Sequence, residues 1–264
     1  MSSPLVAEVA GRAARDALAG GEGEVVAVFR RSFYVHVDGK YACIGDASLG
    51  RGPLNVLVRG FEEPVLRQKI AVNLENAQLW EPVPFRGGAR PHLDALRAAL
   101  DGHVPEEGLG CTILGVHNAL SVHAQPALEA IDRWLAGHAL ANEAAKLIGL
   151  GPGLTPSGDD YLGGVLLGLR WLGRGAQADS LWRWLEPRLE SRTSAISAAH
   201  LAAAALGQAH EALHEVLDNL AAWQAPDLHP SLARLDAVGH TSGWDALAGV
   251  VAVAREQKPL FMLL

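Results

Sequence analysis

The chain has 264 residues, which is enough for one large domain or two modest domains with a substantial buried core. Its formal net charge of −7 argues against nucleic acid or an anionic membrane surface as the main partner, because either would favour a basic face. The two cysteines, Cys43 and Cys111, form no CxxC pattern, so we expect a reduced cytoplasmic protein without a catalytic thiol. No stretch is apolar for long enough to predict a membrane span.

The first third of the chain predicts a short helix followed by strands. Residues 2–21 read as a short amphipathic helix, with acidic residues among the apolar ones. Residues 24–84 contain short runs rich in β-branched and aromatic residues, and Asp38-Gly39 joins two of them with a strong hairpin signal. We predict a small antiparallel sheet or partly closed barrel of about five to seven strands.

From residue 91 the apolar residues follow a helical period, and several segments end at glycine. The predicted fold class is therefore α+β, with a β-rich N-terminal domain over residues 1–90 and an all-α domain over residues 91–264. Residues 84–91 form the expected boundary. They are either a simple linker or a segment that brings a basic side chain to a ligand, and Arg51 is a similar candidate for holding an anion.

The most distinctive stretch is GLGPGLTPSGDD, residues 149–160, which leads into an apolar run. Its alternating glycines permit positive φ and close backbone approach, and Ser157 with Asp160 resembles a short capping box at a helix start. Backbone amides converging at a helix N-terminus suit an anion. Asp159 and Asp160 would repel that anion unless Mg²⁺, held by one or both, bridged to it. Alternatively, the serine and aspartate only cap the helix, and the glycines only allow close packing.

A second stretch, HTSGWDALAGVV over residues 240–251, repeats part of this pattern. When Ser157 is aligned with Ser242, Asp160 falls on Asp245 and Gly164 on Gly249, and the shared pattern is S-G-x-D-x-L-x-G-V. Two helices with a glycine at the same depth are expected to cross at close range. Their N-termini would then converge on one ligand or merely on each other, unless the similarity is chance in a chain rich in Gly, Ala and Leu.

Small hydroxyl-bearing residues mark a third segment, residues 192–201, where they recur every third or fourth residue along a helix. One interpretation is that these hydroxyls bond back to carbonyls of the preceding turn. The other is that Arg192, Thr193, Ser194 and Ser197 face the two serine-led helix starts and complete a polar pocket.

The two motifs together resemble the AllH-like family, largely uncharacterised bacterial proteins related to a subunit of oxamate carbamoyltransferase from anaerobic allantoin breakdown, a part of purine catabolism. The resemblance covers mainly residues 149–264 and implies a role in carbamoyl transfer between oxamate and carbamoyl phosphate. It does not imply that this chain carries the chemistry, because the family's activity belongs to an assembly of several chains. The expected partners are therefore a small anion and other subunits or further copies of the chain.

The sequence thus predicts one polar site in the helical domain. The catalytic candidates are Asp159, Asp160 and His240, and the first two are also candidate Mg²⁺ ligands. The expected ligand-binding residues come from all three segments: Gly151, Gly153, Leu154, Thr155, Ser157, Gly158, Arg192, Thr193, Ser194, Ser197, Thr241, Ser242, Gly243 and Asp245. A competing hypothesis is a non-catalytic assembly subunit whose Gly-rich motifs serve helix packing only.

Overall fold

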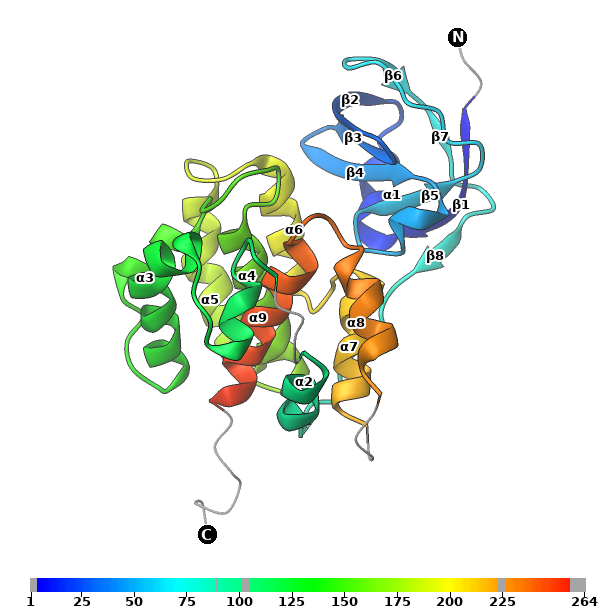
Figure 1. Cartoon of the computed structure of the whole chain (residues 1–264). Coiled ribbons are helices and arrows are strands. Elements are labelled where there is room, and N and C mark those ends of the chain that lie inside the picture. The colour runs from blue at the N-terminus through cyan, green and yellow to red at the C-terminus, as the bar shows by residue number, and fades with distance from the viewer. Residues whose placement is uncertain (1–3, 89, 101–104, 223–226, 257–264) are drawn as a thin grey trace. The chain divides into compact units, whose positions relative to one another are not determined.

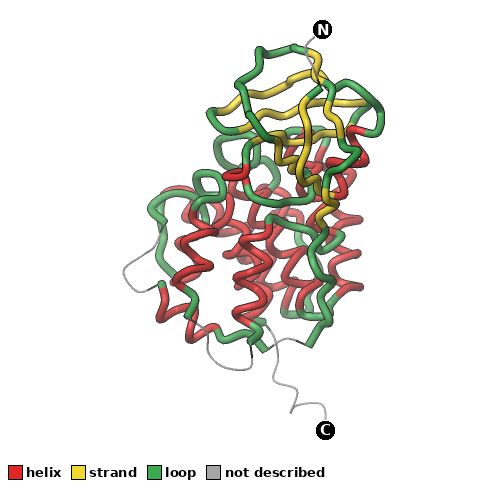
Figure 2. The backbone as a smooth tube through the Cα atoms, turned by 90° about the vertical axis from the view of Figure 1, so that its right-hand side faces the viewer, coloured by secondary structure: helices red, strands yellow, loops and turns green. Residues whose placement is uncertain are grey.

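The computed structural model describes residues 4–88, 90–100, 105–222 and 227–256. The chain divides into two compact units. The first comprises Met1–Val83 with Gln208–Glu211, and the second comprises Pro84–Gly207 with Ala212–Leu264. Figure 2 shows strands gathered in the first unit and helices in the second, which confirms the α+β fold class.

The first unit is a mixed sheet that nearly closes into a barrel. Its strands are β1 (Leu5–Gly11), β2 (Gly23–Phe29), β3 (Ser32–Val37), β4 (Lys40–Gly45), β5 (Asn55–Val58), β6 (Lys69–Ile70), β7 (Val72–Asn73) and β8 (Gln78–Trp80). Their order is β6-β2-β3-β4-β5-β1-β7, and β8 also pairs with β1. Only Ala71 separates β6 from β7, so the chain itself draws the two edges of the sheet together.

Strand pairing differs from the antiparallel prediction, because β1 pairs in parallel with β7 and β8, and β4 pairs in parallel with β5. The predicted leading helix was also wrong over its first half, since residues 5–11 are β1 and α1 spans only Arg12–Leu18. Three neighbouring strands, β5, β7 and β8, pair with β1, and this pairing outweighs the amphipathic pattern that favoured a helix. The hairpin prediction is confirmed, with φ of 46° at Asp38 and 80° at Gly39.

The second unit consists of helices. The α-helices are α2 (Leu93–Ala99), α3 (Ala119–Leu135), α4 (Ser157–Trp171), α5 (Gly175–Leu189), α6 (Ala195–Ala205), α7 (Glu211–Leu220), α8 (His229–Asp236) and α9 (Ser242–Arg255). Short 3₁₀ helices cover Gly110–Leu114 and Asn142–Leu147, and a third, in the first unit, covers Ala47–Leu49. None of the described helices combines the length and apolar character needed to cross a membrane.

Helices α4 and α9 form the centre of the second unit and cross at very close range (Figure 1). A Cβ atom added to Gly164 would lie 1.9 Å from the Ala246 carbonyl oxygen, and one added to Gly249 would lie 2.0 Å from the Tyr161 carbonyl oxygen. The contact is reciprocal, because the offset that aligns Gly164 with Gly249 also aligns Tyr161 with Ala246. The repeat in the sequence is therefore a repeat in space, and each glycine admits the backbone of the other helix.

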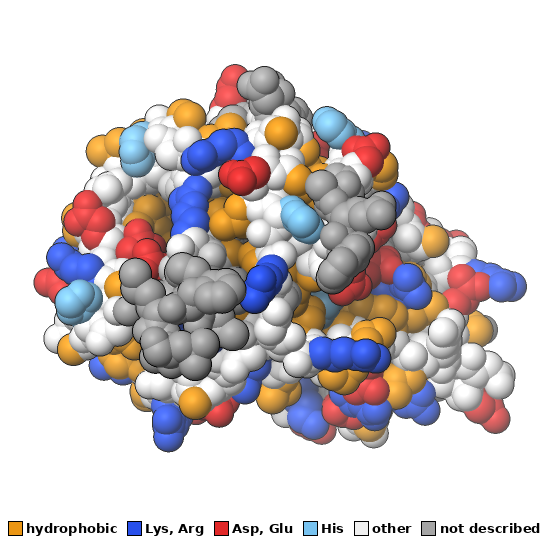
Figure 3. All heavy atoms as spheres, turned by 90° about the horizontal axis from the view of Figure 1, so that it is seen from below, with side chains coloured by type: hydrophobic (Ala, Val, Ile, Leu, Met, Phe, Trp, Pro, Cys, Tyr) orange, Lys and Arg blue, Asp and Glu red, His pale blue; other side chains and the backbone are white. Residues whose placement is uncertain are grey.

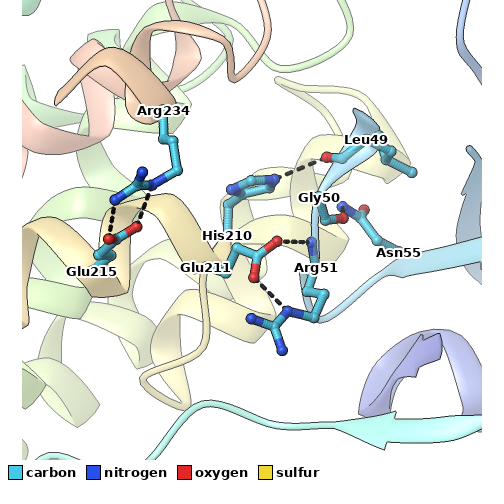
Figure 4. A network of polar contacts seen from close by, with 8 residues as sticks. All are labelled: Leu49, Gly50, Arg51, Asn55, His210, Glu211, Glu215 and Arg234. Carbon is cyan, nitrogen blue, oxygen red and sulfur yellow. Dashed lines mark hydrogen bonds and ion pairs between the residues drawn. The ribbon is translucent and has the colours of Figure 1, made fainter. Parts of the chain in front are cut away.

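The segment Gln208–Glu211 packs with the first unit (Figure 4). Glu211 accepts a hydrogen bond from the Arg51 backbone amide at 2.6 Å and forms an ion pair with the Arg51 guanidinium. His210 contacts the Leu49 carbonyl oxygen at 2.9 Å. The guanidinium of Arg51, one of the candidates for holding an anion, therefore has a carboxylate partner within its own unit.

We expect Gly164→Ala and Gly249→Ala each to destabilise the protein by more than about 3 kcal/mol, because the added methyl group would overlap a backbone oxygen of the partner helix. Denaturant unfolding of the purified variants measures this loss.

Gly163→Ala is the matched control, because its added Cβ would lie 3.7 Å from the nearest neighbouring atom. We expect that variant to be neutral or more stable by up to about 1 kcal/mol, as for other glycines inside helices. Equal losses at Gly163 and Gly164 would contradict the close crossing.

Candidate functional site

The Gly-rich loop adopts the backbone conformation that its glycines predict. Gly149, Gly151 and Gly153 have φ of 75°, 112° and 93°, values that other residues rarely adopt. Four backbone amides of the loop donate to no acceptor among the described residues: those of Gly151, Gly153, Leu154 and Thr155. The amide of Gly158, in contrast, bonds the Leu150 carbonyl oxygen at 2.9 Å. The loop thus presents free donors just ahead of the N-terminus of α4.

Asp159 is buried and has protein donors on both carboxylate oxygens. Its Oδ1 accepts from the Gly149 amide at 2.9 Å, and its Oδ2 accepts from the Ser197 hydroxyl at 2.7 Å and from the Thr193 hydroxyl. These bonds fix the loop and the start of α6 to α4. The Asp159 carboxylate therefore helps to hold the loop and the start of α6 in place.

The start of α6 lies against the first motif. One of the two interpretations of the hydroxyl-bearing residues in 192–201 was that they face this motif. Ser194 is the N-cap of α6 and accepts from the Ser197 amide, and its hydroxyl donates to the Leu154 carbonyl oxygen at 2.7 Å. Arg192 is exposed and donates to the Ala145 carbonyl oxygen at 3.3 Å. The hydroxyls of this segment therefore hold the loop in place by bonds within the protein.

Asp245, the counterpart of Asp160 in the repeat, is fully buried and surrounded by donors. It accepts from the backbone amides of Leu109 and Gly110 and from the Thr241 hydroxyl, the last at 2.8 Å. Burial raises the pKa of Asp245, and these bonds together with one from the Ser157 hydroxyl act in the opposite direction. Residues 108–110 lie far from the second motif in the sequence and carry no motif of their own, so local patterns could not predict this contact.

Asp160 differs from both other aspartates, because the residue is partly exposed while its buried Oδ2 has no hydrogen-bond partner among the described residues. Burial raises the pKa of the Asp160 carboxyl well above its usual range, and the charges of Asp245 and Asp159 raise it further. The Ser242 and Thr155 hydroxyls lower that pKa by hydrogen bonding. Their own oxygens lie 3.2 Å apart.

The predicted capping boxes were wrong, because Ser157 and Ser242 are the first residues of their helices. The N-caps are Pro156 and Thr241, and neither makes a side-chain capping bond. The two helix starts meet instead through the Thr155 and Ser242 hydroxyls, whose oxygens lie within hydrogen-bond distance. The Ser157 hydroxyl lowers the pKa of Asp245, and the Ser242 hydroxyl lowers that of Asp160.

The remaining residues of the second motif lie in different surroundings. Gly243 is buried, and a Cβ there would lie 2.5 Å from the Leu235 carbonyl oxygen, so this glycine serves packing. His240 is on the surface, with its side chain 83% exposed, and its Nε2 lies 2.7 Å from Oε2 of Glu107, itself 72% exposed. The bond that the structure shows for His240 is thus with a surface carboxylate.

Two cavities in the helical unit, of about 190 and 510 Å³, are lined by residues outside the predicted site. The acidic and basic side chains in the view of Figure 3 are intermixed over the described surface. Among the described residues, no group of three or more His, Cys, Asp or Glu is placed to hold a metal ion. Since Asp159 already has three donors, the donor set at the loop does not fit Mg²⁺, and we derive no step through a metal.

We expect Asp159→Asn to lower the free energy of unfolding by about 1–3 kcal/mol, because an amide nitrogen would face donors that now meet a carboxylate oxygen. For a chain of this size, each kcal/mol corresponds to about 2–4 °C in Tm. Differential scanning calorimetry measures the loss, and a Tm equal to that of the unmodified protein would contradict the structural role.

Asp160→Asn should act in the opposite direction, with an effect that depends on pH. The folded-state pKa of Asp160 is raised, so the folded protein holds this proton more tightly than the unfolded chain does, and the contribution of Asp160 to stability falls as pH rises above about 4. The variant should therefore gain Tm relative to the unmodified protein between pH 4 and pH 8. A difference in Tm that stays constant over this range would argue against the buried, unpartnered carboxyl.

Residues 147–254 match the protein family described as oxamate carbamoyltransferase subunit AllH. The matched range contains the Gly-rich loop, the start of α6 and the second motif, which are the segments brought together around α4 and α9. No solved structure matches this chain significantly. This match agrees with the resemblance of the two motifs to the AllH-like family.

Proposed function

We propose that this chain is a component of a carbamoyltransferase system and that its Gly-rich loop binds a small anion, either carbamoyl phosphate or oxamate. The observation that carries the proposal is the set of loop amides from Gly151 to Thr155, which have no protein acceptor within residues 105–222 and precede the positive end of the α4 dipole. The match to the family supports the carbamoyl chemistry.

Positioning and charge stabilisation are the contributions that this site would make. Attack on a carbamoyl carbon leaves negative charge on oxygen, which fixed backbone amides can meet without reorganising. Asp160 is the side chain of the motif with an oxygen left to bond a ligand, whereas Asp159 and Asp245 are occupied by protein donors. His240, the third catalytic candidate, lies on the surface beside Glu107, so the proposal gives it no role in holding the anion.

The family description names a subunit, and this supports further protein partners for the chain. We propose that the β-rich N-terminal domain is the surface that docks those partners. The same proposal places the protein in the cytoplasm, in allantoin degradation.

A second candidate function is a non-catalytic assembly subunit. The observation that favours it is the number of motif residues engaged within the protein, among them Gly164, Gly249, Asp159 and Asp245. On this account the motifs serve the helix crossing, and the chain binds no small anion.

A thermal shift experiment separates the two functions. A ligand that binds only the folded state raises Tm, by about 2.7 kcal/mol of stability at 100 times its Kd. We expect carbamoyl phosphate or oxamate to raise the Tm of the purified chain, and sodium chloride at matched ionic strength to have no effect. Absence of a shift with either compound, and with inorganic phosphate, would favour the assembly subunit.

Gly153→Ala tests whether the loop is responsible, and Gly137→Ala is its matched control. Both glycines have positive φ, of 93° and 105°, and neither would place a Cβ within 4 Å of another atom. Each variant should lose about 1–2 kcal/mol from backbone strain. Only Gly153→Ala should also lose the response to the anion, and an equal response in both variants would place the binding elsewhere.

A further inference from the structure

The two serine-led motifs align in the sequence as an internal repeat, so each aspartate can be compared with its counterpart. Asp245 accepts hydrogen bonds on both carboxylate oxygens, from two backbone amides and a threonine hydroxyl. Asp160 occupies the same place in the first motif, and its Oδ2 has no partner among the described residues although it is buried. The repeat therefore shows which hydrogen bonds Asp160 lacks.

The sequence explains part of this difference. Thr241, whose hydroxyl bonds Asp245 Oδ2 at 2.8 Å, aligns with Pro156, which carries neither a hydroxyl nor an amide hydrogen. The segment Leu109–Gly110, which supplies the two amides to Asp245, packs against the second motif. Near Asp160 lie the hydroxyls of Ser242 and Thr155, which lower its pKa. A buried oxygen without a partner costs free energy that a suitable ligand would recover.

We propose that Asp160 is a specificity-determining residue that accepts an N–H hydrogen bond from an amide-bearing anion held on the loop. At Asp245, the counterpart of Asp160, protein donors make bonds of this kind to the carboxylate. Thr155 connects the two halves of the site, since its backbone amide is one of the free loop donors and its hydroxyl lies beside the Asp160 carboxyl. The ligand class is thus a small carboxylate or phosphate that carries a primary amide or carbamoyl group.

This inference rests on the anion site proposed above, and a matched pair of ligands separates the two. Oxamate and pyruvate have the same shape and charge, and they differ by an NH₂ group in place of a methyl group. A site that bonds an N–H rejects the analogue without it more strongly than size alone would. We expect isothermal titration calorimetry of the full chain to give a Kd for oxamate at least about tenfold lower than that for pyruvate.

Two variants test the role of Asp160 itself. Asp160→Leu, of similar volume and without an acceptor, should bind oxamate and pyruvate with equal affinity. Glu107→Gln removes an exposed carboxylate beside the second motif and should keep the preference for oxamate. Circular dichroism confirms folding of each variant, and if Asp160→Leu does not fold, the comparison of the two ligands on the unmodified protein still decides.

The outcomes are distinct. Tighter binding of oxamate that is lost in Asp160→Leu supports the inference. Equal binding of oxamate and pyruvate by the unmodified chain overturns it while leaving the anion site intact, and the unpartnered oxygen is then met by water. A preference that survives in Asp160→Leu also overturns it. Absence of binding by either anion overturns both the inference and the proposed function.

Discussion

The helical unit depends on the close crossing of α4 and α9. A glycine on each helix admits a backbone carbonyl group of the other, and any side chain at Gly164 or Gly249 would occupy the space of those atoms. Beyond the glycines, the Thr155 and Ser242 hydroxyl oxygens lie 3.2 Å apart and join the two helix starts. The close backbone contact thus specifies one arrangement, because each glycine meets the carbonyl group of the other helix only in this register.

This crossing has a consequence for charge. Three carboxyl groups gather near two helix N-termini, where dipoles favour negative charge but burial opposes it. Asp159 and Asp245 are compensated by donors from the loop, α6 and the Leu109–Gly110 segment. Asp160 has fewer donors to offset the cost of its burial, and the charges of Asp245 and Asp159 raise its pKa further. Of these three carboxyl groups, Asp160 is the one with a buried oxygen that has no hydrogen-bond partner among the described residues.

The sequence predicted the parts of the fold that depend on local patterns. Asp38-Gly39 gave the hairpin, because few residue pairs accept positive φ at both positions. The repeated S-G-x-D-x-L-x-G-V pattern indicated two helices crossing at their glycines. Local patterns were insufficient where the structure depends on contacts with distant segments. The residues of β1 have a helical pattern, yet they form a strand because three other strands pair with them.

The same limit applies to the site. Neighbouring aspartates in the sequence looked equivalent, yet Asp159 points to α6 and is saturated, whereas Asp160 keeps an unpartnered oxygen. Ser157 and Ser242 are the first residues of their helices, not the N-caps, and the local pattern favoured a capping box within one helix. His240 could be assigned to the motif by position only, and its actual partner, Glu107, belongs to a segment that carried no recognisable signal.

If the crossing leaves one carboxyl oxygen and a row of loop amides for a ligand, a crystal structure of the chain with oxamate will show both in use. We expect the oxamate carboxylate on the amides between Gly151 and Thr155, and the oxamate nitrogen within hydrogen-bond distance of Asp160. Electron density showing Asp160 Oδ2 bonded to another residue of the chain, or oxamate bound away from the loop, would contradict it.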